Sequence, residues 1–127
     1  MTHEDYMNQA LTLAREAAAH GEVPVGCVIV RDGKIIGRGR NRREEKQAVS
    51  SHAEMEAMAQ ANEALGSWRL EDCDLYVTLE PCPMCAGAII NARVRRVFYG
   101  ARDRAMGACG CLLYRSPSPR DRTRSRM

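Results

Sequence analysis

Residues 74–100 read DLYVTLEPCPMCAGAIINARVRRVFYG, and this stretch decides the fold expected for the chain. Asp74–Leu79 is an apolar run typical of a buried strand, and Arg96–Gly100 is a second such run. Between them, Pro83 stands one residue inside a helix start, where its missing N–H costs nothing, and the helical pattern continues to about Ala92. Strand, helix and strand in this order predict a parallel β-α-β unit.

The residues before this unit predict a hairpin and two further helices. Arg31-Asp32-Gly33 has the turn chemistry of an antiparallel hairpin, and Ser51-His52-Ala53-Glu54 fits the S-x-x-E capping box that opens a helix. The segments expected here are a helix over Glu4–His20, strands over Val25–Val30 and Lys34–Gly39, a loop over Arg42–Ser50, and a helix from Ser51 to about Leu65. The whole order predicts an α/β fold with a mixed sheet and helices on its faces.

Length and charge limit what the chain can be. With 127 residues it is long enough for one domain with a single core. The formal net charge is +3, but residues 115–127 hold five arginines against Asp121, so the remainder is slightly acidic. The net charge therefore does not imply a positively charged domain surface that binds phosphates. Met1–Ala10 is polar and the longest apolar stretch is far shorter than a membrane span, so we expect a soluble, cytoplasmic protein without a membrane partner.

His52, Cys82 and Cys85 form the strongest chemical pattern. One imidazole and two thiolates make a three-ligand zinc site whose fourth position is open to water, and H-x-E followed by P-C-x-x-C is the signature of zinc-dependent base deaminases. Both ligand segments fall at expected helix starts, where the helix dipole favours thiolate at the two cysteines. In this interpretation zinc-bound water, with its pKa lowered toward about 7, is the nucleophile.

Two other interpretations of these ligands stay open. A structural zinc site needs a fourth protein ligand, and the cysteines that could supply one are Cys27, Cys73, Cys109 and Cys111. None of these belongs to a second C-x-x-C pair. A thioredoxin-like redox pair would use Cys82 and Cys85, but it would leave His52 and Glu54 without a role.

Glu54 also has two possible tasks. As the glutamate of the capping box it would only close the first helical turn. As a general acid and base it would take a proton from the zinc-bound water, deliver it to a ring nitrogen and later protonate the departing ammonia. Residues at i and i+2 do not share a helix face, so shared access with His52 requires the helix to begin at the ligand itself.

Several longer segments resemble one family. The chain from about residue 5 to residue 113 is similar to the bacterial tRNA-specific adenosine deaminases, a branch of the cytidine/deoxycytidylate deaminase superfamily. The segments that carry the resemblance are Glu22-Val23-Pro24-Val25-Gly26, Gly39-Arg40-Asn41-Arg42, His52-Ala53-Glu54, Leu75 through Ala88, and Gly100-Ala101-Arg102-Asp103.

The resemblance implies a cytidine deaminase-like three-layer α/β/α fold with one zinc ion per subunit. It implies hydrolytic deamination of the wobble adenosine of a tRNA anticodon to inosine, with water attacking C6 of a flipped-out base. By the same resemblance Asn41 would contact the flipped nucleotide, Val25 and Leu79 would line its pocket, and Asp103 would touch a neighbouring ribose. The family works as a homodimer that binds the anticodon stem-loop across its interface.

Plainer interpretations of these four residues remain open. Val25 and Leu79 could be ordinary core residues, and Asn41 could simply shape the end of a strand. Aromatic residues make up only 5% of the chain, which argues against a sheet that holds RNA by several stacked bases. Recognition would then depend on phosphate contacts, loop shape and one pocket.

The C-terminal end departs from the family, whose members continue into a further strand and a helix. We expect a deaminase domain over residues 1–114 that lacks those elements, followed by a disordered Arg/Ser/Pro tail over 115–127. The tail could be merely solvated, could bind phosphates nonspecifically, or could result from an altered reading frame or an engineered end that replaced the usual terminus. Without the usual terminus, the strand over 96–100 would be an exposed sheet edge.

The sequence therefore predicts a zinc-dependent deaminase of adenosine in tRNA. One alternative is an enzyme acting on a free base or nucleoside such as guanine or cytosine. The other is a noncatalytic RNA-binding protein with structural zinc.

Overall fold

A four-stranded mixed sheet with the order β2-β1-β3-β4 forms the middle of the protein. The structure is a computed structural model, and it describes residues 1–101. Its elements are α1 (His3–Ala19), β1 (Gly26–Arg31), β2 (Lys34–Arg40), α2 (Arg43–Lys46), α3 (Ala53–Leu65), β3 (Cys73–Leu79), α4 (Pro83–Ala92) and β4 (Arg96–Ala101).

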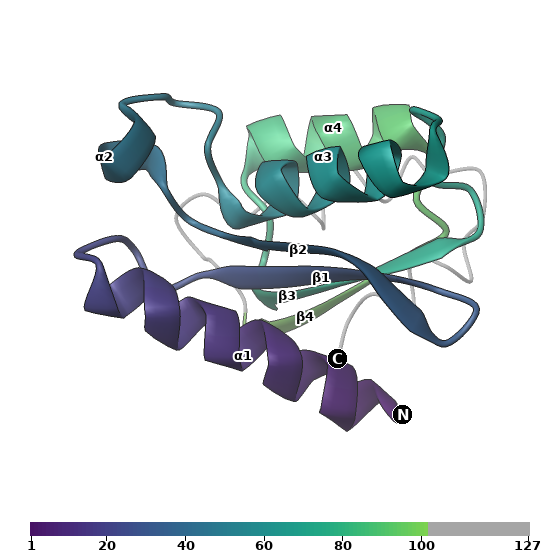
Figure 1. Ribbon diagram of the computed structural model, residues 1–127, viewed down its shortest axis with the longest axis horizontal. Helices are drawn as coiled ribbons and strands as arrows, with labels where there is room; N and C mark the ends of the chain where they lie inside the picture. Colours follow the sequence, from purple (N-terminus) through teal and green to yellow (C-terminus); the bar gives the residue numbers. More distant parts are fainter. Residues whose placement is uncertain (102–127) are drawn as a thin grey trace.

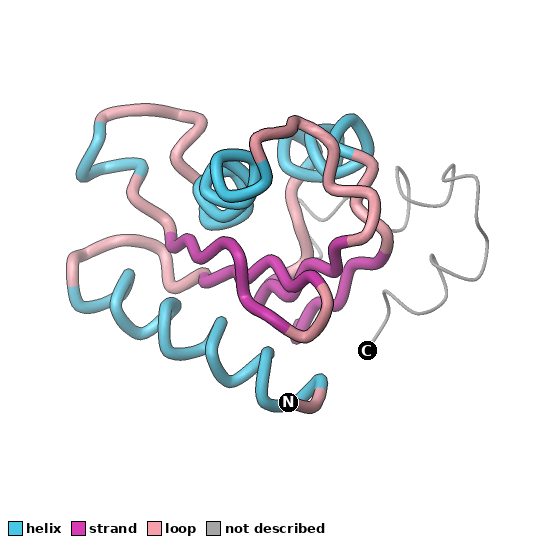
Figure 2. Tube along the Cα trace, turned by 45° about the vertical axis from the view of Figure 1, so that its right-hand side comes forward, coloured by secondary structure: helices cyan, strands magenta, loops and turns pink. Residues whose placement is uncertain are grey.

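The elements are stacked in three layers, as expected (Figure 1). Helix α1 covers one face of the sheet, and α3 and α4 lie side by side on the other face, an arrangement that the rotated trace repeats (Figure 2). Strand β1 pairs antiparallel with both β2 and β3, whereas β3 and β4 are parallel. The expected hairpin and the parallel β-α-β unit are therefore confirmed.

Local chemistry explains the ends of these elements. Asp32 and Gly33 have φ values of 50° and 75°, the left-handed conformation that a two-residue hairpin turn requires. Pro83 is the first residue of α4, as its fixed φ favours. Helix α1 opens with a capping box, in which Thr2 accepts from the Asp5 amide while the Asp5 carboxylate accepts from Thr2.

Two apolar clusters fill the spaces between the layers, because alternate residues of each strand face opposite sides of the sheet. The smaller cluster, against α1, contains Tyr6, Val28, Val30, Tyr76 and Phe98. The larger cluster, against α3 and α4, includes Cys27, Ile29, Ala57, Leu75, Val77, Ile89 and Tyr99.

Helix α3 lies unusually close to β2 because glycines replace side chains in the strand. A Cβ on Gly39 would lie 2.3 Å from the Ala53 carbonyl oxygen and 2.6 Å from the Ala57 nitrogen, and a Cβ on Gly37 would lie 2.3 Å from the Ala57 carbonyl oxygen. Only glycine allows backbone to approach backbone at this distance. The strand thereby sets the height at which the start of α3 sits over the sheet.

Two local expectations were wrong. The segment 42–50 is not entirely a loop, because Arg43–Lys46 forms the short helix α2. Helix α3 begins one residue later than a capping box at Ser51 would place it: His52 is the N-cap and no side chain of the cap donates or accepts a capping bond. The reason is tertiary, since an acceptor from another segment takes over the first amide of this helix, as described below.

Three expectations fall wholly or partly outside the described residues. Asp103, the tail over 115–127 and the boundary between residues 114 and 115 all lie beyond residue 101. Strand β4 is outermost in the part of the sheet that the structure describes. Over the same residues, no helix combines the length and apolar character needed to cross a bilayer.

Candidate active site

The starts of α3 and α4 bring three potential metal ligands together. His52 is the N-cap of α3 and Cys82 is the N-cap of α4, and both have extended backbone conformations. Cys85 lies in the first turn of α4 and is fully buried. Because both helices follow strands of one sheet and pack on the same face, residues 30 positions apart in sequence meet at one end of that layer.

The spacing of the three ligand atoms fits a tetrahedral zinc ion. His52 Nδ1 lies 3.6 Å from Cys82 Sγ and 3.5 Å from Cys85 Sγ, and all three ligand atoms lie within 4.8 Å of one another. Bond lengths of about 2.0 Å to nitrogen and about 2.3 Å to sulfur at a tetrahedral angle separate these atoms by about 3.6 Å. The donor set and its spacing therefore match the ion that the sequence pattern predicts.

A fourth protein ligand is absent from this group among residues 1–101. No other His, Cys, Asp or Glu atom of the described chain joins the three. Cys27 and Cys73 are buried free thiols outside the group, and Cys109 and Cys111 lie beyond the described residues. Within the described part, the arrangement has the three ligands of a catalytic site and lacks the closed shell of a structural site.

Glu54 lies beside the ligands and is almost completely enclosed, with 4% of its surface exposed. Burial raises the pKa of its carboxyl group to about 7, because desolvation disfavours the charged form. A carboxyl group with a pKa in this range can both accept and release a proton near neutral pH. Since no cap bond to the start of α3 involves Glu54, the capping-box role for this residue is wrong.

Burial also shifts the pKa values of His52 and Cys85. Partial burial, helped by the positive charge of Arg43, lowers the pKa of His52 and so favours the neutral imidazole that binds metals. Burial raises the pKa of the Cys85 thiol, and the negative charge of Glu54 raises it further. At Cys85 burial thus outweighs the expected help from the helix dipole, and a cation between the ligands is what would favour the thiolate there.

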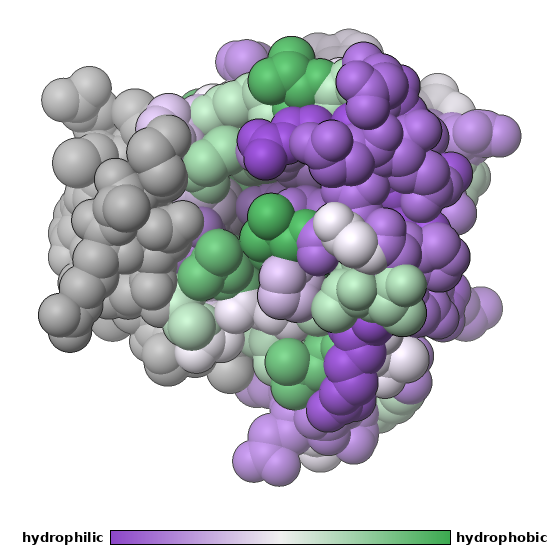
Figure 3. Space-filling model, turned by 90° about the vertical axis from the view of Figure 1, so that its left-hand side faces the viewer, coloured by the Kyte–Doolittle hydropathy of each residue, from purple (hydrophilic) through white to green (hydrophobic). Residues whose placement is uncertain are grey.

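A cavity of about 540 Å³ opens over the ligands. Figure 3 views the molecule from the α2 end and shows apolar side chains on this face beside strongly hydrophilic ones. The lining includes His52, Glu54 and Cys82, together with Asn41, Val25 and Leu79, which the family resemblance had suggested as substrate contacts. The structure thus places six of the eight suggested site residues around one cavity, with Cys85 buried behind it and Asp103 outside the described residues.

Asn41 also has a structural task that the sequence pattern did not reveal. Its Oδ1 accepts a hydrogen bond of 2.8 Å from the amide of Ala53, the first residue of α3. Asn41, which lies 12 positions away in the sequence, thus satisfies an amide at the start of α3, the task expected of the local capping box at Ser51. Because the oxygen faces the helix, the amide nitrogen of Asn41 remains as the donor end of the side chain at the cavity.

Sequence reasoning missed several residues of the cavity wall. Besides the residues already named, the lining comprises Val23, Arg43, Val49, Glu80, Pro83 and Met84. Val23 and Val49 are exposed apolar residues at 50% and 73%, and neither belongs to a periodic pattern that would mark it. The polar sequence of Arg42–Ser50 predicts a loop, so only the folded position of α2 reveals this part of the wall.

Comparison with known proteins gives consistent matches. The model of the MafB19-like deaminase family matches residues 1–113. The tRNA-specific adenosine deaminase of Bacillus subtilis is 50% identical over 114 residues, which are 89% of this chain and 71% of that protein.

Two solved structures are also similar. One comes from work on A-to-I editing by tRNA:A34 deaminases at the wobble position; it has a TM-score of 0.85 and 48% identity, covering 91% of this chain and 90% of that one. The other is the guanine deaminase of Bacillus subtilis, with a TM-score of 0.78 and 46% identity over 80% of this chain and 66% of that one.

Proposed function

Because the chain belongs to the MafB19-like deaminase family, among the tRNA-specific adenosine deaminases, we propose that it deaminates adenosine hydrolytically to inosine at the wobble position of a tRNA anticodon. The reaction consumes water and releases ammonia. One observation carries this proposal: an open group of His52, Cys82 and Cys85 lies with the buried carboxyl of Glu54 at a cavity of about 540 Å³. A volume of this size suits a small organic group such as a nucleoside.

His52, Cys82 and Cys85 would hold one zinc ion per subunit. When bound, zinc supplies a Lewis acid that makes water a nucleophile near neutral pH. The chain itself provides the geometry, because two helix starts fixed on one sheet hold the three donor atoms at the required spacing before any ligand arrives. The neutral imidazole of His52 is already in its binding form.

Glu54 is the residue that moves protons. Its carboxylate accepts a proton from the attacking water and passes it to a ring nitrogen of the purine. It then takes the proton of the new hydroxyl group on C6 and delivers it to the amino group, which leaves as ammonia while the C6 carbonyl of inosine forms. A pKa raised to about 7 by burial suits both directions of transfer. Burial also keeps bulk water away from the transferred proton.

The cavity wall positions the base. Val25 and Leu79 offer apolar surface for the flipped ring, and the amide nitrogen of Asn41 is the donor available to it, because Oδ1 is held by Ala53. The partner expected for this cavity is the anticodon stem-loop of tRNA, and the family resemblance suggests Asp103, outside the described residues, as a contact to a neighbouring ribose. From the family resemblance we also expect a homodimer that works in the cytoplasm.

A second candidate is deamination of a free base. The guanine deaminase of Bacillus subtilis shares the fold at 46% identity, so the catalytic group alone does not select the substrate. The test compares product formation from an anticodon stem-loop with that from free adenine, guanine, cytosine and their nucleosides. Turnover of a free base without inosine formation in the RNA would reject the tRNA proposal.

The variant Glu54→Ala tests the catalytic assignment. We expect bound zinc to stay at one ion per chain while inosine formation falls at least about 10²-fold, because the proton carrier is lost but the ligands are intact. Glu54→Gln is the matched variant, which keeps the size of the side chain and should be equally inactive. If either variant deaminates at the rate of the unsubstituted chain, the mechanism is wrong; if both lose zinc and unfold, the structural-zinc alternative gains support.

A further inference from the structure

The segment 41–52 joins β2 to α3 and forms one wall of the cavity through Arg43 and Val49. Its only regular element is α2, which is four residues long. A helix this short does not persist by its own hydrogen bonds. Its N-cap, Arg42, makes no side-chain cap bond, so the conformation of this wall depends on contacts from other segments.

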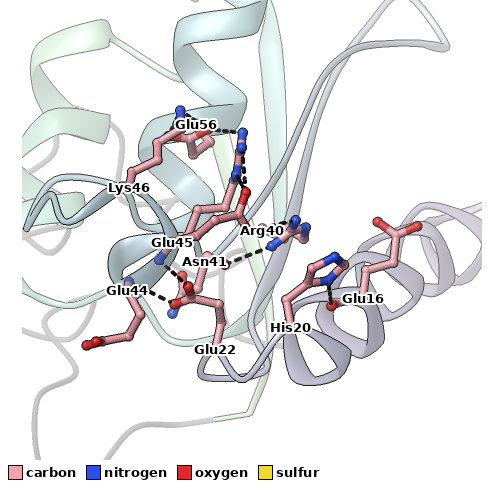
Figure 4. A network of polar contacts seen from close by, with 10 residues as sticks. Glu16, His20, Glu22, Arg40, Asn41, Glu44, Glu45, Lys46 and Glu56 are labelled. Atoms are coloured by element: carbon pink, nitrogen blue, oxygen red, sulfur yellow. Dashed lines mark hydrogen bonds and ion pairs between the residues drawn. The ribbon is translucent and has the colours of Figure 1, made fainter.

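Glu22 supplies the most direct of these contacts. Its side chain is buried, with 7% of the residue exposed, and its two carboxylate oxygens accept from the amides of Glu44 at 3.2 Å and Glu45 at 2.8 Å (Figure 4). The first turn of α2 is therefore capped by a residue more than 20 positions earlier. Because Glu22 precedes Val23 and Val25, this contact ties two walls of the cavity to each other.

Ion pairs hold the same segment to β2 and α3. Glu45 pairs with Arg40 at 3.1 Å and with Arg42 at 2.7 Å, and Lys46 pairs with Glu56 at 3.0 Å (Figure 4). Each pair alone contributes little at a surface, but together they restrict where α2 can lie. The other cationic side chains of the segment, Arg42 and Lys46, therefore form ion pairs, whereas Arg43 forms none with the described residues.

Arg43 differs from its neighbours in its surroundings. Within residues 1–101 its guanidinium makes no hydrogen bond or ion pair, and it is the only lysine or arginine of the described chain that lines the cavity. Its backbone is fixed all the same, because the Arg43 carbonyl accepts from the amide of Ala48 at 3.1 Å. An unpaired guanidinium that projects from a held backbone at the wall of a cavity is suited to an oxyanion with bidentate geometry, such as a phosphate.

We propose that Arg43 binds the backbone phosphate next to the target nucleotide of an RNA loop, and that Glu22 is the positioning residue that holds Arg43 there through α2. The proposal rests on the function proposed above. It adds a contact between Arg43 and a phosphate, and the contact of Glu22 with α2 that positions Arg43. When a base enters the cavity its phosphates stay at the mouth, where Arg43 lies. The contact fixes the register of the RNA and does not read its sequence.

The first experiment measures binding of an anticodon stem-loop in a Glu54→Ala background, so that no turnover occurs. Arg43→Gln should weaken binding about fivefold, and the slope of log Kd against log salt should become less steep by about 0.7 to 0.9. Arg38→Gln is the matched control, since Arg38 is an exposed arginine of β2 outside this cavity and should leave Kd and slope unchanged.

The second experiment tests the role of Glu22 by a double-variant cycle. Glu22→Gln keeps the size of the side chain but replaces one carboxylate oxygen by an NH₂ group. That group cannot accept a hydrogen bond, so either the Glu44 or the Glu45 amide loses its acceptor. In chains that retain Glu54 we expect a higher KM for the stem-loop, with kcat and zinc content unchanged. Added to Arg43→Gln, the Glu22 substitution should weaken binding no further.

Several results would overturn the proposal. If Arg43→Gln has the same Kd and the same salt slope as the unsubstituted chain, Arg43 does not contact a phosphate. If the effects of the Glu22 and Arg43 substitutions on Kd are independent and multiply, Glu22 does not act through Arg43. Competition by adenosine 5′-monophosphate that depends on Arg43, with unchanged RNA binding, would assign the contact to free nucleotides instead. Inosine formation by the unsubstituted chain on the same RNA tests the proposed function separately, because binding is measured without turnover.

Discussion

The two ends of the Asn41 amide have different surroundings. The oxygen accepts from the first amide of α3, directly after His52, and we propose that the nitrogen donates to the substrate. Asn41→Ala should lower the free energy of unfolding by about 0.5–2 kcal/mol, as the loss of a cap does. Asn41→Asp should keep that stability, because a carboxylate accepts from the same amide, yet it should still lose most of its activity.

Urea unfolding and inosine formation, measured on both variants, check this division. If Asn41→Asp is as active as the unsubstituted chain, the donor contact with the base does not exist. If Asn41→Ala is as stable as the unsubstituted chain, the bond to Ala53 does not hold the start of α3.

Asp74 carries the clearest pH dependence of stability. Burial by itself would raise the pKa of Asp74, but hydrogen bonds from Arg96 and Arg95 outweigh it and hold the pKa below its usual range. Asp74 therefore binds a proton less readily in the folded state than in the unfolded chain. The contribution of ionised Asp74 to stability is complete above about pH 4, and it is lost as the pH falls through the pKa that Asp74 has in the folded state.

Asp74→Asn should accordingly destabilise the protein at pH 7 by about 1–3 kcal/mol, and the difference should shrink toward pH 3. Urea unfolding at both values measures it. Asp72→Asn is the control, since Asp72 is 69% exposed and its contact with Arg31 is 3.9 Å long. A difference for Asp74→Asn that is constant with pH would contradict the ionic origin of the contribution.

At the scale of elements, the packing of α3 on β2 decides where the catalytic group lies. Gly39→Ala would place a methyl group 2.3 Å from the Ala53 carbonyl oxygen, so the start of α3 must move. We expect a loss of about 1–3 kcal/mol in stability and weaker zinc binding, because His52 moves with the helix.

Gly87→Ala is the matched control for that substitution. Gly87 lies inside α4, and a Cβ there meets no atom within 4 Å. Alanine should stabilise the helix by about 0.5–1 kcal/mol without changing metal affinity. Thermal unfolding and zinc titration distinguish the two variants; equal zinc affinity in Gly39→Ala would show that the ligand geometry tolerates a shift of α3.

At the scale of the whole molecule, a metal ion would join two helices that contact each other little except through the sheet. Ligands from the starts of α3 and α4 exist as a set only in the folded chain, so binding must stabilise that state. Removing zinc with a chelator should lower the Tm by at least about 5 °C.

Cys82→Ser provides the comparison for this measurement, since it removes one ligand at the surface of the cavity. Its Tm should already be low and should respond little to the chelator. An unchanged Tm in the unsubstituted chain after metal analysis has confirmed removal would show that the three residues hold no ion in solution.

Much of the architecture could be predicted because its causes are local. Short apolar runs in the strands, Asp32-Gly33 in the hairpin turn and Pro83 at the start of α4 each determine their element from neighbours in the chain. The pattern of His52, Cys82 and Cys85 named the metal chemistry for the same reason, since ligand type and spacing are properties of the sequence. The wrong expectations, α2 and the Ser51 capping box, concern segments whose partners lie elsewhere.

The tertiary structure alone decided how those parts work together. Asn41 replaces the local cap of α3 and Glu22 caps α2, because folding places their oxygens at amides that sequence separation hides. The pKa of Glu54 reaches about 7 only because packing removes water from its carboxyl group. Hydrogen bonding, close backbone approach and desolvation all depend on distances between remote segments. The residues of this protein therefore determine its elements and its ligands, and the packing determines their chemistry.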